Sequence, residues 1–195
     1  MILLEDDYWE IRETKKKGRG IFSKKIILQG TVIGDYLGKI IHPQDAVVDE
    51  ENFYLMYYHD QAAIAPDLKK PGVHLLNHSC VPNAFLYTHM GHTLAFALRN
   101  IAKNEELTIP YLLSPKDDFC NPCLHVCKCG SRKCSKTMHL EKDKYDKWRE
   151  FNEKWTKRTK RKRISYGKEL PMLADYPKTI SPEYIRGVNR LFENT

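Results

Sequence analysis

The sequence predicts a β-rich fold followed by a C-terminal helix. The first half holds short runs of strand-forming residues that are separated by Gly, Pro and Asn, a pattern typical of irregular, mainly β proteins. The runs are 20–22, 31–33, 36–41, 62–65, 93–98 and 107–109. From Lys136 onward the chain is highly charged, and Tyr145, Trp148, Phe151 and Trp155 recur every three or four residues. Such spacing predicts a long helix over residues 136–163 with one aromatic face that packs on the domain.

Two further helices are expected. Residues 43–59 have Phe53, Met56 and Tyr57 at helical spacing, which predicts a helix between the strands of the first half. After Gly167, several prolines predict a looped stretch. A last short helix is expected over residues 182–192, with Ser181 as its N-terminal cap.

Length and composition indicate one domain, or one domain with a small appendage. The chain has 195 residues, 42% of them hydrophobic, enough for a core. No apolar run approaches the ~20 residues of a membrane span, so no membrane association is expected. Residues 1–10 are acidic and aromatic, unlike a signal peptide. We therefore expect the protein to reside in a reducing compartment, where the six cysteines would be metal ligands or buried thiols rather than disulfides.

Positive charge is concentrated at residues 157–163, KRTKRKR, in a chain of net charge +7. Such a run suits contact with nucleic acid or a nucleosome, an acidic partner or a nuclear import receptor. A solvated helix end is the alternative interpretation.

Three closely spaced cysteines indicate a zinc site. Cys127, Cys129 and Cys134 lie around Gly130, which favours a tight turn. A closed structural zinc site needs four ligands, so the fourth comes from Cys80, Cys120 or Cys123. Cys120 and Cys123 are themselves a CxxC pair, which can supply ligands to this site or remain two plain thiols.

The triplet Gly18-Arg19-Gly20 does not indicate a dinucleotide-binding fold, because the third glycine of that fingerprint is missing. A Rossmann-type methyltransferase is therefore not supported.

Three motifs follow one another along the chain: NHSCVPN at 77–83, EELTIPY at 105–111, and CxCxxxxC at 127–134. Together with the Gly18-Arg19-Gly20 triplet they resemble the SET-domain protein lysine methyltransferases that carry a post-SET zinc site. The resemblance covers roughly residues 10–140. It implies small curved β-sheets around a pseudoknot, in which the segment of Tyr111 passes near a loop with Asn77 and His78. The domains implied are a SET domain at 1–118, a post-SET zinc segment at 119–140 and a basic helical extension at 141–195.

The resemblance also implies an activity, the transfer of a methyl group from S-adenosylmethionine to a lysine ε-amino group of a protein. Such an in-line displacement needs positioning and exclusion of water more than acid–base groups. Tyr111 would be the catalytic tyrosine that orients the amine, and Tyr36 would line an aromatic lysine channel. The residues implied to bind the cofactor are Arg19, Gly20, Tyr54, Asn77 and His78. The zinc ligands implied are Cys80, Cys127, Cys129 and Cys134.

Departures from the family pattern bear on the product. Ile109 and Leu86 stand where some members carry a tyrosine, so no extra hydroxyl is expected to tether a water in the pocket, and methylation beyond the first step is expected. Pro110 precedes Tyr111 where a polar residue is common, and His74 stands where an arginine is frequent.

The expected substrate is a lysine-containing protein, with histone tails as the leading candidate, and the expected location is nuclear or chromatin-bound. Cytoplasm, or a host cell if the source is bacterial, are the alternative locations. The alternative function is an inactive SET-like zinc module that binds chromatin or nucleic acid through its basic C-terminal helix.

Overall fold

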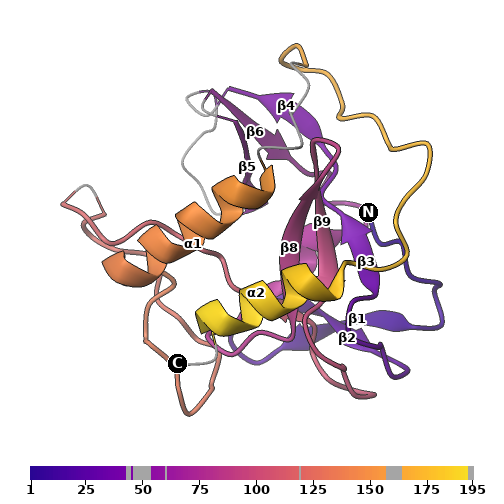
Figure 1. Ribbon diagram of the computed structural model, residues 1–195, viewed down its shortest axis with the longest axis horizontal. Helices are drawn as coiled ribbons and strands as arrows, with labels where there is room; N and C mark the ends of the chain where they lie inside the picture. Colours follow the sequence, from indigo (N-terminus) through magenta and orange to yellow (C-terminus); the bar gives the residue numbers. More distant parts are fainter. Residues whose placement is uncertain (43–44, 46–53, 60, 119, 157–163, 193–195) are drawn as a thin grey trace.

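A computed structural model describes residues 1–42, 45, 54–59, 61–118, 120–156 and 164–192. The architecture is mainly β, as the sequence predicted, and the described residues form several small sheets and two α-helices (Figure 1). The strands are β1 (Trp9–Thr14), β2 (Gly18–Ser23), β3 (Val32–Asp35), β4 (Lys39–Ile41), β5 (Met56–His59), β6 (Ala62–Ala65), β7 (Asn77–His78), β8 (Ala84–His89), β9 (His92–Ala97) and β10 (Thr108–Ile109). The helices are α1 (Lys142–Thr156), α2 (Pro182–Phe192) and the short 3-10 helix η3 (Val73–Leu75).

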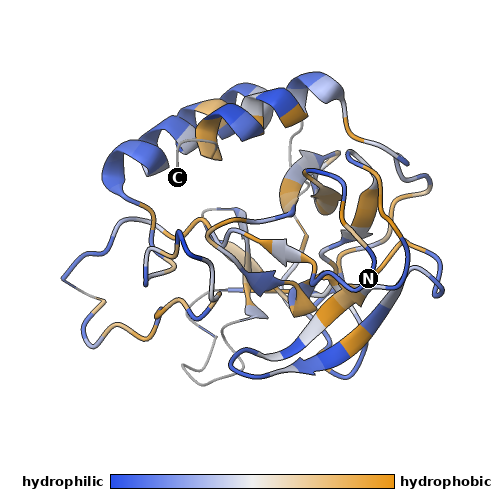
Figure 2. Cartoon of the chain, turned by 90° about the horizontal axis from the view of Figure 1, so that it is seen from below, coloured by the Kyte–Doolittle hydropathy of each residue, from blue (hydrophilic) through white to orange (hydrophobic). Residues whose placement is uncertain are grey.

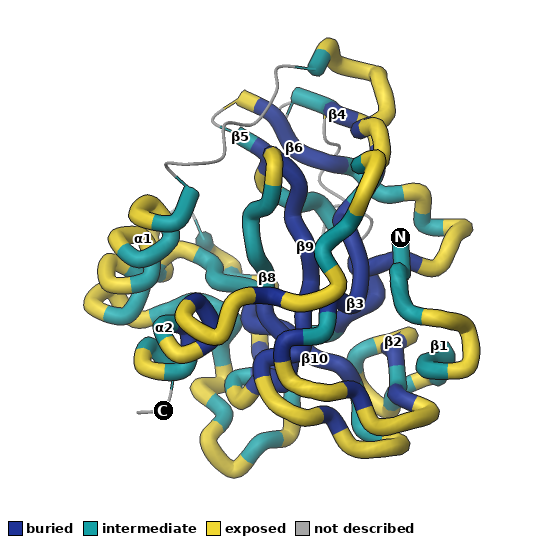
Figure 3. The backbone as a smooth tube through the Cα atoms, turned by 45° about the vertical axis from the view of Figure 1, so that its right-hand side comes forward, coloured by how far each residue is buried: buried dark blue, intermediate teal, exposed yellow. Residues whose placement is uncertain are grey.

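Within the described residues the strands form three antiparallel sheets and one parallel pair. The sheets have the strand orders β1-β2, β3-β9-β8 and β4-β6-β5, and β10 lies parallel to β7. Strand β9 is central in its sheet, and all six of its residues are buried (Figure 3). Its last four residues, LAFA, are accordingly apolar on both faces of the sheet rather than alternating with polar residues.

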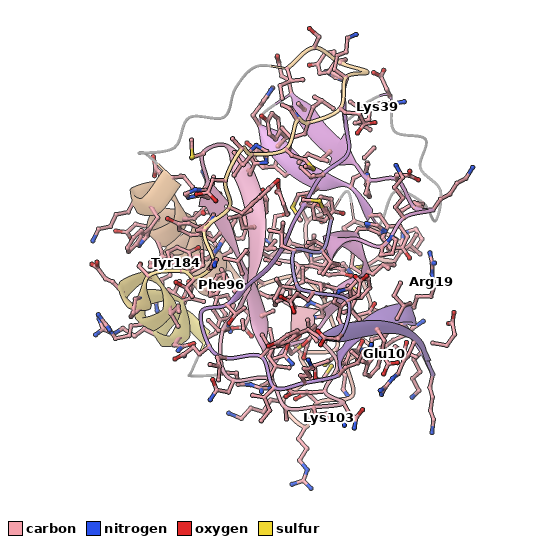
Figure 4. All side chains as sticks on the ribbon, turned by 90° about the vertical axis from the view of Figure 1, so that its right-hand side faces the viewer. Glu10, Arg19, Lys39, Phe96, Lys103 and Tyr184 are labelled. Carbon is pink, nitrogen blue, oxygen red and sulfur yellow. The ribbon has the colours of Figure 1, made fainter. Side chains whose placement is uncertain are left out.

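The helices lie together along one side of the sheets (Figure 2). Helix α2 buries Tyr184, Ile185 and Val188 in a core cluster. The same cluster contains Phe85 of β8 and Phe96 of β9. Figure 4 shows Tyr184 of α2 and Phe96 of β9 close together, and their ring centroids lie 5.9 Å apart. The N-terminal cap of α2 is Ser181, whose Oγ accepts the Tyr184 N–H at 3.3 Å, as expected.

Helix α1 reaches the core through α2. Its aromatic side chains Trp148, Phe151 and Trp155 pack against the same cluster, which confirms the predicted aromatic face. The two helices approach closely where α2 has Gly187, since a Cβ there would come within 2.4 Å of the Phe151 ring. Any larger residue at 187 would push the helices apart.

Two helix predictions need correction. The helix expected over 43–59 is wrong in its last part, because Met56–His59 forms strand β5 against β6. Residues 43–44 and 46–53, with Phe53, lie outside the described residues. The helix expected from Lys136 begins only at Lys142, because residues up to 140 are held in loop pairings such as Val126 with Thr137. The basic run 157–163 also lies outside the described residues.

The chain after α1 returns along the sheets (Figure 1). It forms isolated bridges at Glu169 with Lys39 and at Thr179 with Thr31, and it buries Leu170 in the main core. The described part of residues 141–192 therefore shares the cores of the preceding sheets, while the expected domain boundaries at 118 and 140 stay a prediction. Within the described parts of the chain, no helix is both long enough and apolar enough to span a membrane.

Candidate active site

The site is organised by the parallel pair of β7 and β10. Asn77 lies opposite Thr108 and His78 opposite Ile109, and the Ser79 N–H donates to the Ile109 carbonyl at 3.0 Å. This pairing brings the motif at 77–83 beside the segment that ends in Tyr111. The resemblance implied this adjacency; spacing in the sequence does not reveal it, since about thirty residues separate the two strands.

Tyr111 is held against His78. Its N–H donates to His78 Nδ1 at 3.2 Å, and the two rings meet edge to face with centroids 5.3 Å apart. The Tyr111 hydroxyl donates to the Leu76 carbonyl at 3.4 Å, a long bond that a ligand could replace. Burial, followed by the neighbouring Tyr54, raises the pKa of Tyr111 to about 12. The hydroxyl is therefore neutral near neutral pH, so it can orient a group by hydrogen bonding but is not a base.

Tyr36 and Tyr54 join Tyr111. Tyr36 follows β3, is only 4% exposed, and its hydroxyl donates to the Tyr54 carbonyl. Burial raises the pKa of Tyr36, and the nearby Tyr111 and Tyr54 add to the rise. Three of the tyrosines singled out in the sequence thus lie close together.

A cleft of about 1580 Å³ opens at Tyr36 and Tyr111. One wall includes Tyr36, Leu86 and Tyr111, and Ile109 also lines it. The other wall is α1, which contributes Tyr145, Trp148, Arg149 and Asn152. An aromatic lining suits an alkylammonium chain, because ring faces attract cations.

The contribution of α1 was not foreseen. The periodic aromatic residues of this helix predicted packing on the domain. Trp148 does pack against the core cluster, but it also lines the cleft. Helical periodicity identifies a face but not what lies opposite it, so the sequence offered no signal for this role.

A polar group of residues surrounds Asn77. Its Nδ2 donates to the Arg19 carbonyl at 3.1 Å and to Glu106 Oε1 at 2.9 Å, and Lys17 Nζ lies 2.6 Å from Glu106 Oε2. Gly20 makes this possible, because a Cβ there would come within 2.7 Å of Asn77 Nδ2. The Arg19 guanidinium points elsewhere, to the Leu68 carbonyl at 3.4 Å. Lys17 and Glu106 were missed; Glu106 lies within a motif, but nothing in the sequence assigned it a role.

His78 links Tyr111 to the cysteines. Because Nδ1 accepts the Tyr111 N–H, the proton of the neutral ring is on Nε2, which lies 3.6 Å from Cys80 Sγ. Burial, with a smaller effect of Lys17, lowers the pKa of His78 to about 4, which keeps the ring neutral. Both ring nitrogens therefore have partners within the chain.

Cys80, Cys127, Cys129 and Cys134 converge, with all four sulfurs within 4.8 Å of one another. Cys80 Sγ and Cys127 Sγ are 3.6 Å apart, near the separation of about 3.8 Å expected for two thiolates on one tetrahedral zinc. The turn at Gly130 has a positive φ of 74°, which glycine adopts without strain. The cluster is consistent with a post-SET zinc site. Cys120 and Cys123 lie in a different group, with His125 and His139.

The burial of His74 makes the stability of the fold sensitive to acid. His74 is 8% exposed, and its Nε2 has no hydrogen-bond partner among the residues that the structure describes. Burial, then the N-terminal ammonium group and Arg19, lower its pKa from 6.5 to about 4. Between these two values the unfolded chain binds a proton that the folded chain does not, so the free energy of unfolding falls as the pH falls from 6.5 to 4.

Replacing His74 with Phe should flatten this dependence while keeping the edge-to-face contact with Tyr54. Between pH 7 and pH 4.5 the wild type should lose about 2 kcal/mol more unfolding free energy than His74→Phe. Urea titrations at both pH values measure the difference. Parallel losses in the two proteins would contradict the assignment.

The sequence profile of the SET domain matches residues 18–112, a range that contains the tyrosines and the β7–β10 pair. The chain is 28% identical over 144 residues to the histone-lysine N-methyltransferase trithorax of Drosophila virilis, covering 68% of this chain and 4% of that protein. It is 30% identical over 135 residues to the human histone-lysine N-methyltransferase 2B, covering 63% of this chain and 5% of that protein.

A third relative is the H3 lysine-9 specific histone-lysine N-methyltransferase of Schizosaccharomyces pombe. It is 30% identical over 154 residues, covering 64% of this chain and 31% of that protein. The chain thus spans less than a third of the length of each of these relatives. The profile match, the relatives and the geometry agree: residues 18–112 of the chain are a SET domain, related to those of the histone-lysine methyltransferases.

Proposed function

We propose that the chain is an S-adenosylmethionine-dependent protein lysine N-methyltransferase. The observation that carries the proposal is that Tyr36 and Tyr111 line an aromatic cleft beside the β7–β10 pair, with Tyr54 close to both. S-adenosylmethionine would supply the methyl group on its sulfonium. The protein has to hold an unprotonated lysine amine in line with that group and keep water out.

Tyr111 would act on the amine. Its hydroxyl stays protonated up to about pH 12, so it can accept a hydrogen bond from the amine nitrogen and aim the lone pair, but it does not remove the proton. Loss of the lysine proton therefore precedes the reaction. Tyr36 would form a wall of the lysine channel, with its hydroxyl committed to the Tyr54 carbonyl.

The cofactor would lie on the side of Asn77. The amide of Asn77, the ion pair of Lys17 with Glu106, and the main chain around Gly20 place donors and acceptors of both charges together. Such a set suits a ligand that carries both an ammonium group and a carboxylate. We assign cofactor binding to Arg19, Gly20, Tyr54, Asn77 and His78.

Zinc would be held by Cys80, Cys127, Cys129 and Cys134, as four thiolates without an open position. The His78 Nε2–H toward Cys80 Sγ is the kind of outer hydrogen bond that stabilises a metal thiolate. Metal binding would therefore support the segment that carries Asn77 and His78.

A histone is the substrate we propose first, because the relatives carry histone-lysine methyltransferase names. A nuclear or chromatin location follows from the same argument. Residues 157–163 would contribute contact with nucleic acid.

The experiment that tests the proposal is transfer of labelled methyl from S-adenosylmethionine to core histones and to a cell lysate, with mass spectrometry to locate methyl-lysine. Calorimetric titration with S-adenosylmethionine accompanies it. Methyl-lysine in a protein band is the expected result. A folded, zinc-loaded protein that neither binds S-adenosylmethionine nor labels any protein would contradict the proposal and favour the inactive binding module.

The number of methyl groups transferred should depend on Leu86 and Ile109. Both line the cleft with apolar side chains, so the wild type should produce di- or trimethyl-lysine. Leu86→Tyr should shift the product toward monomethyl-lysine, since a new hydroxyl can hold a water in the space of further methyl groups. Mass spectra of the product at long reaction times measure this, with Leu86→Phe as the matched control. Only monomethyl-lysine from the wild type would contradict it.

A further inference from the structure

We propose that Cys120, Cys123, His125 and His139 form a second zinc site, of Cys2His2 type and separate from the four cysteines described above. Neither histidine was singled out by the sequence, because His139 lies well beyond the CxxC pair. Their ligand atoms lie within 4.8 Å of one another. The proposal does not depend on the enzymatic function.

The separations match a tetrahedral ion. Cys120 Sγ is 3.3 Å from both His125 Nδ1 and His139 Nε2. Cys123 Sγ is 3.9 Å from His125 Nδ1 and 3.6 Å from His139 Nε2, and the two ring nitrogens are 3.2 Å apart. With Zn–S near 2.3 Å and Zn–N near 2.0–2.1 Å, a tetrahedron has edges of about 3.6 Å between S and N and about 3.3 Å between two nitrogens.

The tautomer of His139 supports metal binding over hydrogen bonding. His139 Nδ1 lies 2.6 Å from the Ser114 carbonyl, which can only accept, so Nδ1 carries the proton of the neutral ring. The lone pair of Nε2 then points at the two sulfurs and at His125. A histidine that ligates through one nitrogen and donates the other N–H to a backbone carbonyl is the usual arrangement around zinc.

Ligand type indicates the metal. Two thiolates and two imidazoles at tetrahedral spacing suit zinc rather than Mg²⁺ or Ca²⁺, which prefer oxygen. With four protein ligands no position remains for a reacting water, so the site would be structural.

The site is joined to the cleft through Leu113, which lines the cleft. Leu113, two residues after Tyr111, bridges to His139, and the Leu140 N–H donates to the Leu113 carbonyl at 3.1 Å. On the other side the Met138 N–H donates to the His125 carbonyl at 2.9 Å, next to the bridge of Val126 with Thr137. One ion would thus clamp the chain that follows Tyr111 to the segment leading into α1, which begins at Lys142. It would fix the α1 wall of the cleft.

Metal content of the purified full chain tests the proposal. Two zinc ions per chain are expected. The double variant Cys123→Ser/His139→Asn and the variant Cys80→Ser should each retain one. His89→Asn, which changes a histidine of β8 outside both clusters, should retain two.

Cobalt substitution tests the site without mutation. The wild type should show thiolate-to-cobalt absorption from both sites, and Cys80→Ser should keep the spectrum of a site with two sulfur and two nitrogen ligands. One ion with a four-thiolate spectrum in the wild type, or a double variant that keeps the wild-type metal content, would overturn the proposal. One ion with a two-sulfur, two-nitrogen spectrum would support this site and contradict the first one.

Discussion

Tyr111→Phe should lower methyl transfer by roughly 100- to 1000-fold, the usual cost of removing one hydrogen-bonding group that acts on the reacting centre. The fold should be unaffected. Among the described residues the hydroxyl bonds only the Leu76 carbonyl, at 3.4 Å. The N–H bond and the ring contact with His78 do not depend on the hydroxyl. Because the neutral hydroxyl only orients the amine, both enzymes should become faster as pH rises and the lysine loses its proton.

Single-turnover rates with saturating S-adenosylmethionine measure the effect, together with zinc content and cofactor affinity. Tyr8→Phe is the control, since Tyr8 is partly buried against the main core but does not line the cleft; it should retain the wild-type rate. A Tyr111→Phe variant with more than a tenth of the wild-type rate would remove Tyr111 from the catalytic role.

Cys80→Ser should lose one zinc ion and nearly all activity. Cys80 is the ligand that joins the sequence-distant segment 127–134 to the segment of Asn77 and His78. The free energy of a structural zinc site, of the order of 10 kcal/mol in small zinc peptides, is available only when all ligands are present. Without Cys80 the segment is held by few buried contacts, since only Cys127 of the three cysteines there is buried.

Limited proteolysis, zinc content and methyl transfer measure this together. We expect new cleavage within residues 120–140 and an otherwise folded β domain. Ser131→Ala, in the same loop but with no metal ligand atom, should behave as the wild type. Full zinc content and activity in Cys80→Ser would show that the four thiols do not form one site.

Patterns in the sequence predicted the elements that are determined by interactions between residues close together in the chain. Helix α2 with its Ser181 cap, the aromatic face of α1 and the buried strand β9 follow from spacing and capping in neighbouring residues. The expected helix over 43–59 failed at Met56–His59 because pairing with β6 outweighs a short helical pattern. Strands β1 and β8 were also missed, since both mix polar with apolar residues and are stabilised by their hairpin partners β2 and β9.

By itself, the sequence determined the β-rich class, the C-terminal helices, and the family to which three ordered motifs belong. Only the tertiary structure decided which distant residues meet: Asn77 with Glu106, and α1 with the cleft at Tyr111. It also divided the six cysteines into two groups, of which the pair Cys120 and Cys123 lies with His125 and His139. The reason is physical. Helix periodicity and caps depend on residues a few positions apart, whereas these contacts depend on the parallel pairing of β7 with β10 and on the path of the chain between residues 112 and 140.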